Sequence, residues 1–491
     1  MPEIELKLGL TEAAATAVGA TLAARGAETL VLESHYFDTA DRRLARAGLA
    51  LRLRRTGSVW EQTVKGEGAS PIERLEETVT FEPPAAGRAP SPDLALHAGS
   101  AAAPLLERAL GDDADAQLAP VFATAIRRAA LRIETHGAEL EVALDRGVVR
   151  AGERSLPLAE LEVELKDGDV GALIAVGRAS VDAHGMWVST IHKALRGARL
   201  ADPDAARATK ARRPQLEAAA GGAALFRAML QSCLDQVLAN ASVVADADAD
   251  AEAIHQLRVG LRRLRTLRRE LGAWRGALGD AWQAPADALF RALGVLRDRE
   301  TVAASLQQRL RAAGSPAPAL AAEAGDVDAV AAVRAPAFQH ALLDLLEFVL
   351  EPSPERAVRD GDDPGRFVAR RLDKLHKRLR HDAARFDELD EPSRHAVRKR
   401  LKRLRYLAEL VAPLYKERSV KRFVRTLEPA QDALGSFMDL VVASSLAHQI
   451  VEHGDPRAWF NVGWLKAQQP DAVARCTKHL RDVVDAEPFW G

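Results

Sequence analysis

Charged and apolar residues alternate one by one along short segments in the first two hundred residues of the chain. Examples are residues 3–7 (EIELK), 51–54 (LRLR) and 160–165 (ELEVEL). Successive side chains of a β-strand point to opposite faces of its sheet, so each segment has one charged and one apolar face. An amphipathic helix would need an apolar repeat of three to four residues, which these segments lack. The alternation therefore predicts strands that gather their charges on one face of a sheet.

Eight segments of this kind are separated by breaks that are rich in Gly, Pro and Asp. They cover residues 3–8, 29–37, 49–55, 58–65, 74–81, 122–133, 138–144 and 158–166. Helical patterns interrupt them at 11–25, 101–110 and 168–182. Strands joined by short turns usually pair with their sequence neighbours, so the pattern favours an antiparallel barrel or sandwich with helices outside it.

The apolar period becomes helical from about residue 218 to the end of the chain. Helical segments cover 223–240, 251–272, 279–311, 335–352, 364–385, 391–413, 418–451 and 470–484. A chain of 491 residues exceeds the size of a single hydrophobic core. We therefore expect an α+β protein with a sheet domain in 1–203, a linker in 204–217 and an all-α domain in 218–491.

The helical part contains an internal repeat. Residues 255–265 (HQLRVGLRRLR) align without a gap on 395–405 (HAVRKRLKRLR), at an offset of 140 residues. A Leu-Gly pair followed by an Asp recurs at 293–298 and 434–439, at an offset of 141 residues. Because the two copies keep almost the same internal distance, the sequence predicts a duplicated bundle of about four helices per copy.

Composition restricts the classes of function and location. The formal net charge of −1 gives no bulk attraction to nucleic acid or to an anionic membrane. The two cysteines have no metal or redox spacing, and no apolar run approaches eighteen residues. The N-terminus begins an acidic strand and leaves no room for a signal peptide. We therefore expect a cytoplasmic protein without a membrane segment.

The charged faces of the predicted strands carry both cations and carboxylates. Lys and Arg bind phosphate oxygens through charge-assisted hydrogen bonds, and clustered carboxylates are hard oxygen ligands for Mg²⁺. A single strand of this kind usually exposes its charges to water, but a whole set with complementary charges favours an inward-facing site for a metal–polyphosphate complex. The cations are Lys7, Arg52, Arg54, Lys65, Arg128 and Lys193, and the carboxylates are Glu3, Glu5, Glu76, Asp145, Glu160, Glu162 and Glu164.

These residues form an ordered set of motifs. The set is ExExK at 3–7, YFDT at 36–39, LRLR at 51–54, TVK at 63–65, RxE at 74–76, FxT at 122–124 with Arg128, ExExE at 160–164, and Ser189 with Lys193. In this order it resembles the CYTH domain of the triphosphate tunnel metalloenzyme family, over residues 1 to about 200. ExExK alone is weak evidence, but the ordered set is specific. The resemblance implies an eight-stranded antiparallel β-barrel, a tunnel open at both ends, that binds a triphosphate inside.

The same resemblance implies roles for individual residues. The catalytic and phosphate-binding set would be Glu5, Lys7, Arg52, Arg54, Lys65, Glu76, Arg128 and Lys193. The metal ligands would be Glu3, Glu5, Asp145, Glu160, Glu162 and Glu164, with Mg²⁺ as the expected ion and Mn²⁺ as an alternative. Arg127 and Arg128 face opposite ways in a regular strand, so either could point inward. We favour Arg128 because of its distance from Thr124.

The repeated helices each present a row of cations. On a helical wheel that starts at His255, the residues three, seven and ten positions later fall on one stripe, with leucines opposite. We see no Asp or Glu at the compensating i+4 positions within either row. A row of guanidinium groups suits a long polyanion. The rows are His255, Arg258, Arg262 and Arg265 in one copy, and His395, Arg398, Lys402 and Arg405 in the other.

These helices resemble the CHAD domain, an all-α module of two four-helix repeats. The His-x-x-Arg rows, the Leu-Gly pairs and residues 463–465 (GWL) carry the resemblance over about 218–491. It implies binding of inorganic polyphosphate through a basic surface. Nucleic acid is a less favoured partner, because the chain lacks the interleaved aromatic residues that stack on single-stranded bases.

Together the motifs favour a metal-dependent hydrolase that cleaves inorganic triphosphate to pyrophosphate and phosphate, with a second domain that binds polyphosphate. A nucleotide-processing enzyme of the same family (an adenylyl cyclase, or an RNA or thiamine triphosphatase) and a non-catalytic polyphosphate scaffold stay open as alternatives. The sequence also leaves open the oligomeric state, cleavage of longer chains and an association with polyphosphate granules.

Overall fold

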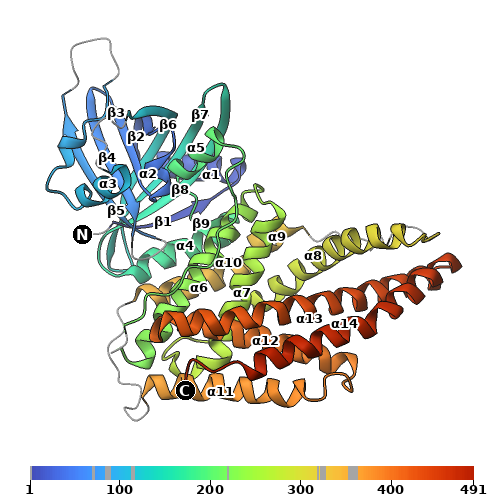
Figure 1. Cartoon of the computed structure of the whole chain (residues 1–491). Helices are drawn as coiled ribbons and strands as arrows, with labels where there is room; N and C mark the ends of the chain where they lie inside the picture. Colours follow the sequence, from blue (N-terminus) through green and yellow to red (C-terminus); the bar gives the residue numbers. More distant parts are fainter. Residues whose placement is uncertain are drawn as a thin grey trace.

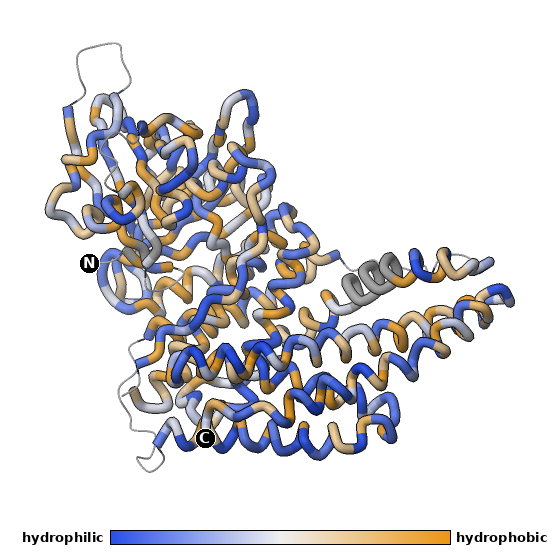
Figure 2. The backbone as a smooth tube through the Cα atoms, viewed as in Figure 1, coloured by the Kyte–Doolittle hydropathy of each residue, from blue (hydrophilic) through white to orange (hydrophobic). Residues whose placement is uncertain are grey.

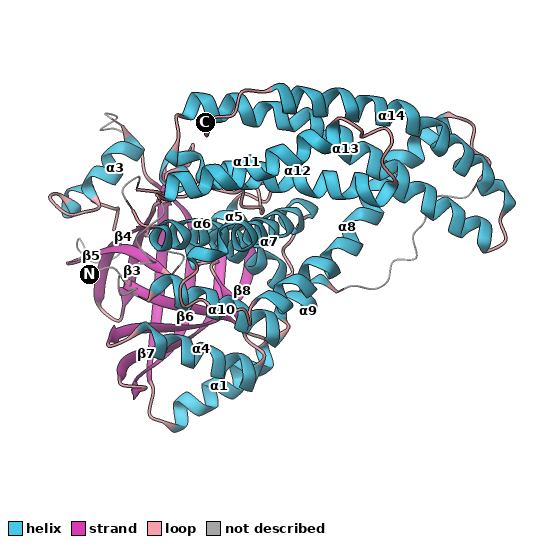
Figure 3. Cartoon of the chain, turned by 90° about the horizontal axis from the view of Figure 1, so that it is seen from below, coloured by secondary structure: helices cyan, strands magenta, loops and turns pink. Residues whose placement is uncertain are grey.

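The structure is a computed structural model that describes residues 3–68, 72–82, 90–111, 117–217, 220–317, 320, 328–351 and 363–491; the side chains of residues 3, 67, 74 and 295–305 lie outside this description. The strands gather in one domain, and long helices form the rest of the molecule (Figures 1 and 3). Within the described residues, the change from a strand period to a helical period in the sequence corresponds to this division.

The sheet domain contains nine described strands that run antiparallel to their neighbours. They are β1 (Glu3–Gly9), β2 (Glu28–Asp38), β3 (Ala50–Thr56), β4 (Val59–Glu67), β5 (Glu73–Phe81), β6 (Ala119–Thr135), β7 (Ala138–Ala151), β8 (Arg154–Asp167) and β9 (Trp187–Ser189). The spatial order is β5-β4-β3-β2-β6-β7-β8-β1-β9. The predicted antiparallel sheet of amphipathic strands is confirmed.

The prediction of an eight-stranded closed barrel is wrong. One edge of β1 pairs along its length with β8, whereas the other edge is shared between two short partners. Its first residues pair with β5 at two positions only, Glu3 with Arg74 and Ile4 with Glu73. Its last three residues pair with β9, the additional strand. The sheet therefore curls on itself without a continuous closing ladder, because β9 takes the place that β5 would need.

Helices cover the outside of the sheet. They are α1 (Glu12–Ala24), α2 (Arg43–Arg46), α3 (Ala103–Leu110) and α4 (Val170–His184), with a short 3₁₀ turn at Leu94–His97. The apolar face of β1 packs beneath α4, and its Leu6 and Leu8 are fully buried. Gly177 of α4 approaches Leu6 so closely that an added Cβ would lie 2.7 Å from its Cδ2 atom. The charged residues of β1 consequently face the inside of the curled sheet.

A fifth helix, α5 (Lys193–Ala201), packs against the inner face of the sheet. Its Ala194 and Leu200 contact a cluster of inward residues that includes Tyr36 and Phe122, whose rings stack at 4.3 Å. Gly197 of α5 lies against the Phe122 ring, where a Cβ atom would overlap it at 2.0 Å. The helix thus fills part of the interior, and its N-terminal Lys193 points toward the charged residues there.

The helical domain is a duplicated bundle, as its repeat predicts. Its helices are α6 (Gly222–Ala245), α7 (Ala251–Leu271), α8 (Gln283–Ala312), α9 (Ala329–Arg334), α10 (Pro336–Leu350), α11 (Pro364–Ala383), α12 (Glu391–Val411), α13 (Glu417–Glu452) and α14 (Trp459–Asp485). The repeated helices α7 and α12 both have 21 residues. Each is preceded by an N-cap Asp, Asp250 or Asp390, whose carboxylate accepts a hydrogen bond from a backbone N–H of the first turn. Each also runs into a short 3₁₀ turn.

One helix of the bundle has a membrane-like composition. By length and composition alone, α13 could cross a membrane, since its most apolar 18 residues have a mean hydropathy of 1.3 and are 39% buried in the fold. It forms a long pair with α14 (Figure 1). Leu434, Phe437 and Leu440 of this helix are buried in the common core. The buried part of its apolar surface therefore belongs to the core of the bundle, and no continuous apolar run marks this helix in the sequence.

Candidate active site

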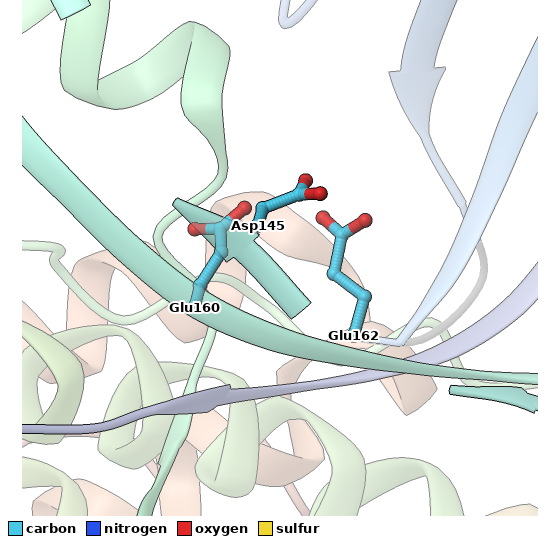
Figure 4. A group of neighbouring side chains, drawn as sticks. All are labelled: Asp145, Glu160 and Glu162. Atoms are coloured by element: carbon cyan, nitrogen blue, oxygen red, sulfur yellow. The ribbon is translucent and has the colours of Figure 1, made fainter. Parts of the chain in front are cut away.

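Three carboxylates converge inside the sheet domain. Asp145 lies on β7 and pairs directly with Glu160 on the neighbouring β8. Glu162 lies two positions after Glu160, so all three side chains point to the same face of the sheet. Each offers an oxygen atom within 4.8 Å of the others (Figure 4). The three residues are 0%, 2% and 7% exposed. Buried carboxylates at this spacing are costly unless cations neutralise them.

Three cations neutralise this acidic cluster. Arg128 on β6 makes a two-pronged contact with Asp145, at 2.7 and 2.8 Å, and also bonds Glu162. The ammonium of Lys193 lies 2.7 Å from Asp145 and 2.6 Å from Glu162, and it bonds Glu160 as well. Lys7 on β1 bonds Glu162 too. The geometry places Arg128 inside, whereas Arg127 is exposed.

The cations act unequally on the three carboxyl groups. Burial opposes ionisation of Glu162, but Lys193, Lys7 and Arg128 outweigh it, so the pKa of Glu162 lies well below its usual range. Burial also opposes ionisation of Asp145, and Lys193 and Arg128 outweigh it, so that pKa is lowered. For Glu160 burial prevails over Lys193, and the pKa is raised. Neighbouring carboxyl groups with pKa values pushed apart are typical of acid–base chemistry.

A second group of charges lies on β3, β4 and β5. Arg52 is 5% exposed; its Nη2 atom donates to Thr63 at 3.0 Å and lies 3.5 Å from Glu76. Lys65 also bonds Glu76. Burial, followed by the neighbouring Arg52 charge, lowers the pKa of Arg54 to about 10. Here, in contrast to the acidic cluster, the positive charges of two arginines outnumber the carboxylates nearby.

One cavity of about 1160 Å³ joins both groups. The predicted residues that line it are Glu5, Lys7, Arg52, Arg54, Lys65, Glu76, Arg128, Glu162, Glu164 and Lys193. Asp145 and Glu160 are not among the lining residues and are buried next to it. Its lining continues past α5 to the linker and to α6 of the helical domain. The cavity therefore combines cations for an anionic ligand with a carboxylate cluster at its wall.

The six predicted metal ligands do not all meet. Glu5 lies on the same face as the cluster but bonds Lys7, at 2.7 Å. Glu164 lines the cavity and bonds Lys166, at 2.6 Å. The side chain of Glu3 lies outside the described residues. The three carboxylates that do converge offer only oxygen donors, which is the donor set of Mg²⁺ or Mn²⁺. They fit a divalent ion, which would be a second counter-charge for the cluster besides the Lys193 ammonium.

The cation rows of the helical domain are less open than the sequence suggests. Arg258 is only 7% exposed. The guanidinium groups of Arg258, Arg262 and Arg265 surround the ring of Phe290 on α8, at 4.9 to 5.4 Å from its centroid. The rows also have carboxylate partners, contrary to expectation. Arg265 lies 2.8 Å from Asp287, which is on the neighbouring helix α8 and could not be found by reading one helix.

The second row shows the same departure. Arg405 lies 2.7 Å from Glu409, four residues later, and 3.3 Å from Glu428 of α13. The i+4 carboxylate that we predicted to be absent is therefore present just beyond the last residue of the motif. The two repeated helices do contact each other, because Arg262 of α7 donates to the hydroxyl of Tyr406 on α12 at 3.3 Å.

A denser group of cations lies where α7, α11 and α12 meet. They surround a small pocket of about 130 Å³ whose lining is Arg269, Glu270, Arg371, Lys374, Leu375, Arg378 and Arg403. Five of these residues are cations and one is an acid. Burial lowers the pKa of Arg403, and the charges of Arg269 and Arg378 lower it further. We call this group the basic pocket. Lys374 and Arg378 lie four residues apart on one face of α11, and the fold brings them together with Arg269 of α7 and Arg403 of α12.

Two known domain families match this chain, one in each of its domains. The model of the CYTH domain matches residues 1–198, and the model of the CHAD domain matches residues 228–448. The chain belongs to the proteins that join a CYTH domain to a CHAD domain. The acidic cluster and its cavity lie in the CYTH domain, and the basic pocket lies in the CHAD domain. The domain limits at 203 and 218 stay predictions.

Among curated proteins, the chain resembles an inorganic triphosphatase of Haemophilus influenzae, with 26% identity over 216 residues. The match covers 40% of this chain and 54% of that relative, so it spans about half the length of each. The solved structures include the CHAD domain of Ricinus communis, at 26% identity with a TM-score of 0.45, covering 57% of this chain and 98% of that one. They also include a Hippeastrum protein described as an adenylyl cyclase with a dominant triphosphatase activity, at 18% identity with a TM-score of 0.28, covering 40% and 96%.

Proposed function

We propose that the CYTH domain hydrolyses inorganic triphosphate to pyrophosphate and phosphate, with a divalent metal ion, and that the CHAD domain binds inorganic polyphosphate. The observation that carries the first part is the buried cluster of Asp145, Glu160 and Glu162 at the wall of a cavity lined with cations. The curated relative named an inorganic triphosphatase supports the choice of reaction.

In this proposal the residues of the cavity divide the work. Arg52, Arg54 and Lys65 would bind the phosphate oxygens, because they form the part of the lining where cations outnumber acids. Asp145 and Glu162 would hold the metal ion, since their lowered pKa values keep them ionised. A bound divalent ion supplies charge neutralisation on the phosphoryl oxygens and lowers the pKa of a bound water.

Glu160 is the residue that we assign to proton transfer. The pKa of Glu160 is raised and so lies closer to neutral pH than the pKa values of its two neighbours. A general base works best when its pKa is near the working pH. Lys193 and Lys7 would keep the carboxylates apart from the incoming phosphates and stabilise the negative charge that develops on the leaving group. No side chain needs to form a covalent bond to phosphorus in this scheme, so water is the nucleophile.

The cavity favours an inorganic substrate over a nucleotide. Apart from His192, Tyr36 is its one aromatic residue among the described lining, and Phe122 stacks on that ring. Trp60 does not line the cavity, and Trp187 is 4% exposed beneath the guanidinium of Arg334. The described lining therefore offers few rings that could stack on a nucleotide base or on a thiazole. A nucleotide-processing enzyme stays the alternative, together with a scaffold without catalysis.

For the CHAD domain the supporting observation is the basic pocket. Its five cations face one acid and so carry a surplus of positive charge. Burial lowers the pKa of Arg403 and of Arg400 next to it, and the neighbouring cations lower both pKa values further. A linear polyanion would relieve that repulsion along its length. The cytoplasm, where both ligands would be met, stays the predicted location.

A hydrolysis panel tests the proposal. The full chain is incubated with triphosphate, pyrophosphate, ATP, thiamine triphosphate and long-chain polyphosphate, with Mg²⁺, with Mn²⁺ and with a chelator, and the products are separated by ion-exchange chromatography. We expect pyrophosphate and phosphate from triphosphate, and no product with the chelator. Cyclic AMP from ATP would favour the cyclase alternative, and an inactive chain that still binds polyphosphate would favour the scaffold.

A further inference from the structure

The two domains share one buried carboxylate, Asp246, the residue that follows α6 of the CHAD domain. Its Oδ2 atom lies 2.7 Å from Nη2 of Arg196 on α5. Its Oδ1 atom accepts a 3.1 Å hydrogen bond from the indole N–H of Trp187 on β9. The Asp246 side chain is only 9% exposed. A single side chain of the CHAD domain therefore bonds two consecutive elements of the CYTH domain, β9 and α5.

The segment that Asp246 holds reaches into the acidic cluster. Arg196 and Lys193 are three residues apart on α5 and so share one face of the helix. Lys193 bonds all three carboxylates of the cluster. Arg196 also lies near the cluster, with its Nε atom 3.9 Å from Oε2 of Glu160. Arg196 thus stands between Glu160 on one side and Asp246 on the other.

Asp246 is itself fixed by its surroundings. Arg334 donates to the backbone oxygen of Ala245, at 2.9 Å from Nε, and its guanidinium stacks on the Trp187 ring at 3.6 Å. On the CYTH side, two backbone N–H groups donate to helical-domain side chains: Val188 to Gln339 at 2.8 Å and Thr190 to Ser242 at 2.9 Å. The carboxylate is therefore an anchored support rather than the end of a mobile loop.

We propose that Asp246 is a positioning residue for the hydrolytic centre, acting through Arg196 to set the place of α5, and with it Lys193, against the acidic cluster. The inference rests on the proposed function for its effect on catalysis. The CHAD domain would then complete the active site of the CYTH domain besides binding polyphosphate. Loss of the carboxylate would leave the Arg196 guanidinium, which is 16% exposed, without its nearest counter-charge. A small displacement of α5 would misplace the reacting groups.

The decisive variant is Asp246→Asn, which keeps the acceptor for Trp187 and removes the charge that faces Arg196. We expect kcat for triphosphate to fall about 10-fold while KM changes less than about 2-fold, because α5 carries no member of the β3 and β4 cation group. Asp248→Asn is the matched control. Asp248 is two residues away and pairs with Arg207 at 3.0 Å and with Arg199 of α5 at 3.8 Å, but its side chain is 47% exposed, so water can replace both contacts. Its substitution should leave both constants unchanged.

A second readout does not depend on activity. Hydrogen–deuterium exchange in metal-free protein should be at least about 3-fold faster across residues 193–201 in Asp246→Asn than in the wild type. Exchange in α7 should stay unchanged, which excludes general unfolding. In a double-mutant cycle, Asp246→Asn should have no further effect on kcat in an Arg196→Gln background. An unchanged kcat, unchanged exchange in α5, or effects that multiply in the double variant would each overturn the proposal. If the wild type releases no phosphate from triphosphate, the proposed function fails, and the exchange experiment still decides whether Asp246 holds α5.

Discussion

The two anion-facing sites of this chain differ in how their charges are balanced. In the CYTH cavity, the three buried carboxylates face three cations of the same interior, Lys7, Arg128 and Lys193. In the basic pocket of the CHAD domain, five cations face a single acid. The charges of the first site are enclosed and nearly cancel one another. In the second site the cations repel one another and lie nearer to the surface. In Figure 2 the tube of α11, which supplies four of its lining residues, is largely hydrophilic.

This difference separates chemistry from binding. Opposite charges held at fixed positions in a buried site can be exchanged for a metal ion and phosphates without a large change in net charge, which suits a reaction. A surplus of one sign has no internal partner and gains free energy when a polyanion arrives, which suits affinity. Substitutions should therefore affect turnover in the first site and affinity in the second, with little effect of either on the other.

The largest effect that we expect comes from Glu160→Gln. The substitution keeps the size of the side chain and removes the group that we assign to proton transfer, so kcat for triphosphate should fall about 1000-fold. Affinity for long-chain polyphosphate, measured by isothermal titration calorimetry, should change less than about 2-fold. Glu134→Gln, on the exposed face of β6, is the control and should retain full activity. Activity above one tenth of the wild type would contradict the role of Glu160.

The charge balance of the cavity should also appear in folding. Glu162→Gln removes a partner of Lys7, Lys193 and Arg128 and should lower the free energy of unfolding of metal-free protein by about 3 kcal/mol at pH 7. The folded-state pKa of Glu162 lies below its unfolded value, so this stabilisation is complete above about pH 4.5. It is lost as the pH falls through the folded-state pKa. Urea unfolding should show the stabilities of the two proteins converging as the pH falls below about 4.5, and a difference that stays constant would refute the assignment.

Arg54→Met should separate function from stability. Arg54 is a member of the cation group that we assign to the phosphates, so kcat/KM for triphosphate should fall about 100-fold. Burial and the neighbouring Arg52 lower the pKa of Arg54 to about 10, which means that its charge destabilises the folded protein at pH 7. The variant should therefore unfold at a higher temperature than the wild type in the absence of ligand.

Arg55→Met is the matched control for this test. It is the next residue on β3, points outward and pairs with Glu33 on the surface, where both side chains are 46% exposed. Its activity should equal that of the wild type, and its melting temperature should not rise. Differential scanning fluorimetry without ligand and initial-rate kinetics measure the two effects. A lower melting temperature for Arg54→Met would show that Arg54 stabilises the empty cavity.

The sequence predicted those parts of the site that depend on local alternation. Because Lys7 and Glu162 each occupy the charged face of a regular strand, their shared interior follows from strand geometry. Strand geometry left Arg127 and Arg128 open, and the distance from Thr124 in the family pattern decided for Arg128. The additional strand β9 escaped prediction because three residues are too short for a period. Helix α5 escaped it as well, although its Lys193 was selected from the family pattern.

Contacts between distant elements could not be read from the sequence in either domain. Arg196 and Asp246 are each unremarkable in their own segments, and only the packing of β9 and α5 against α6 brings them together. The surroundings of the cation rows could not be read from the sequence for the same reason. Their spacing along one helix is correct, but Phe290 of α8 lies against three arginines of the first row and Asp287 pairs with Arg265. A helical wheel shows which side chains share a face and not what that face meets.

The smallest effect concerns the basic pocket. Arg378→Glu reverses a charge that lines it and should weaken binding of long-chain polyphosphate about 10-fold, with a weaker dependence on salt than in the wild type. Arg366→Glu is the control on the same helix, because Arg366 is 82% exposed and does not line the pocket. Turnover of triphosphate should be unchanged in both. If the two reversals weaken binding equally, the helix acts as a diffuse basic surface, and the contrast between an enclosed catalytic site and a defined binding pocket no longer holds.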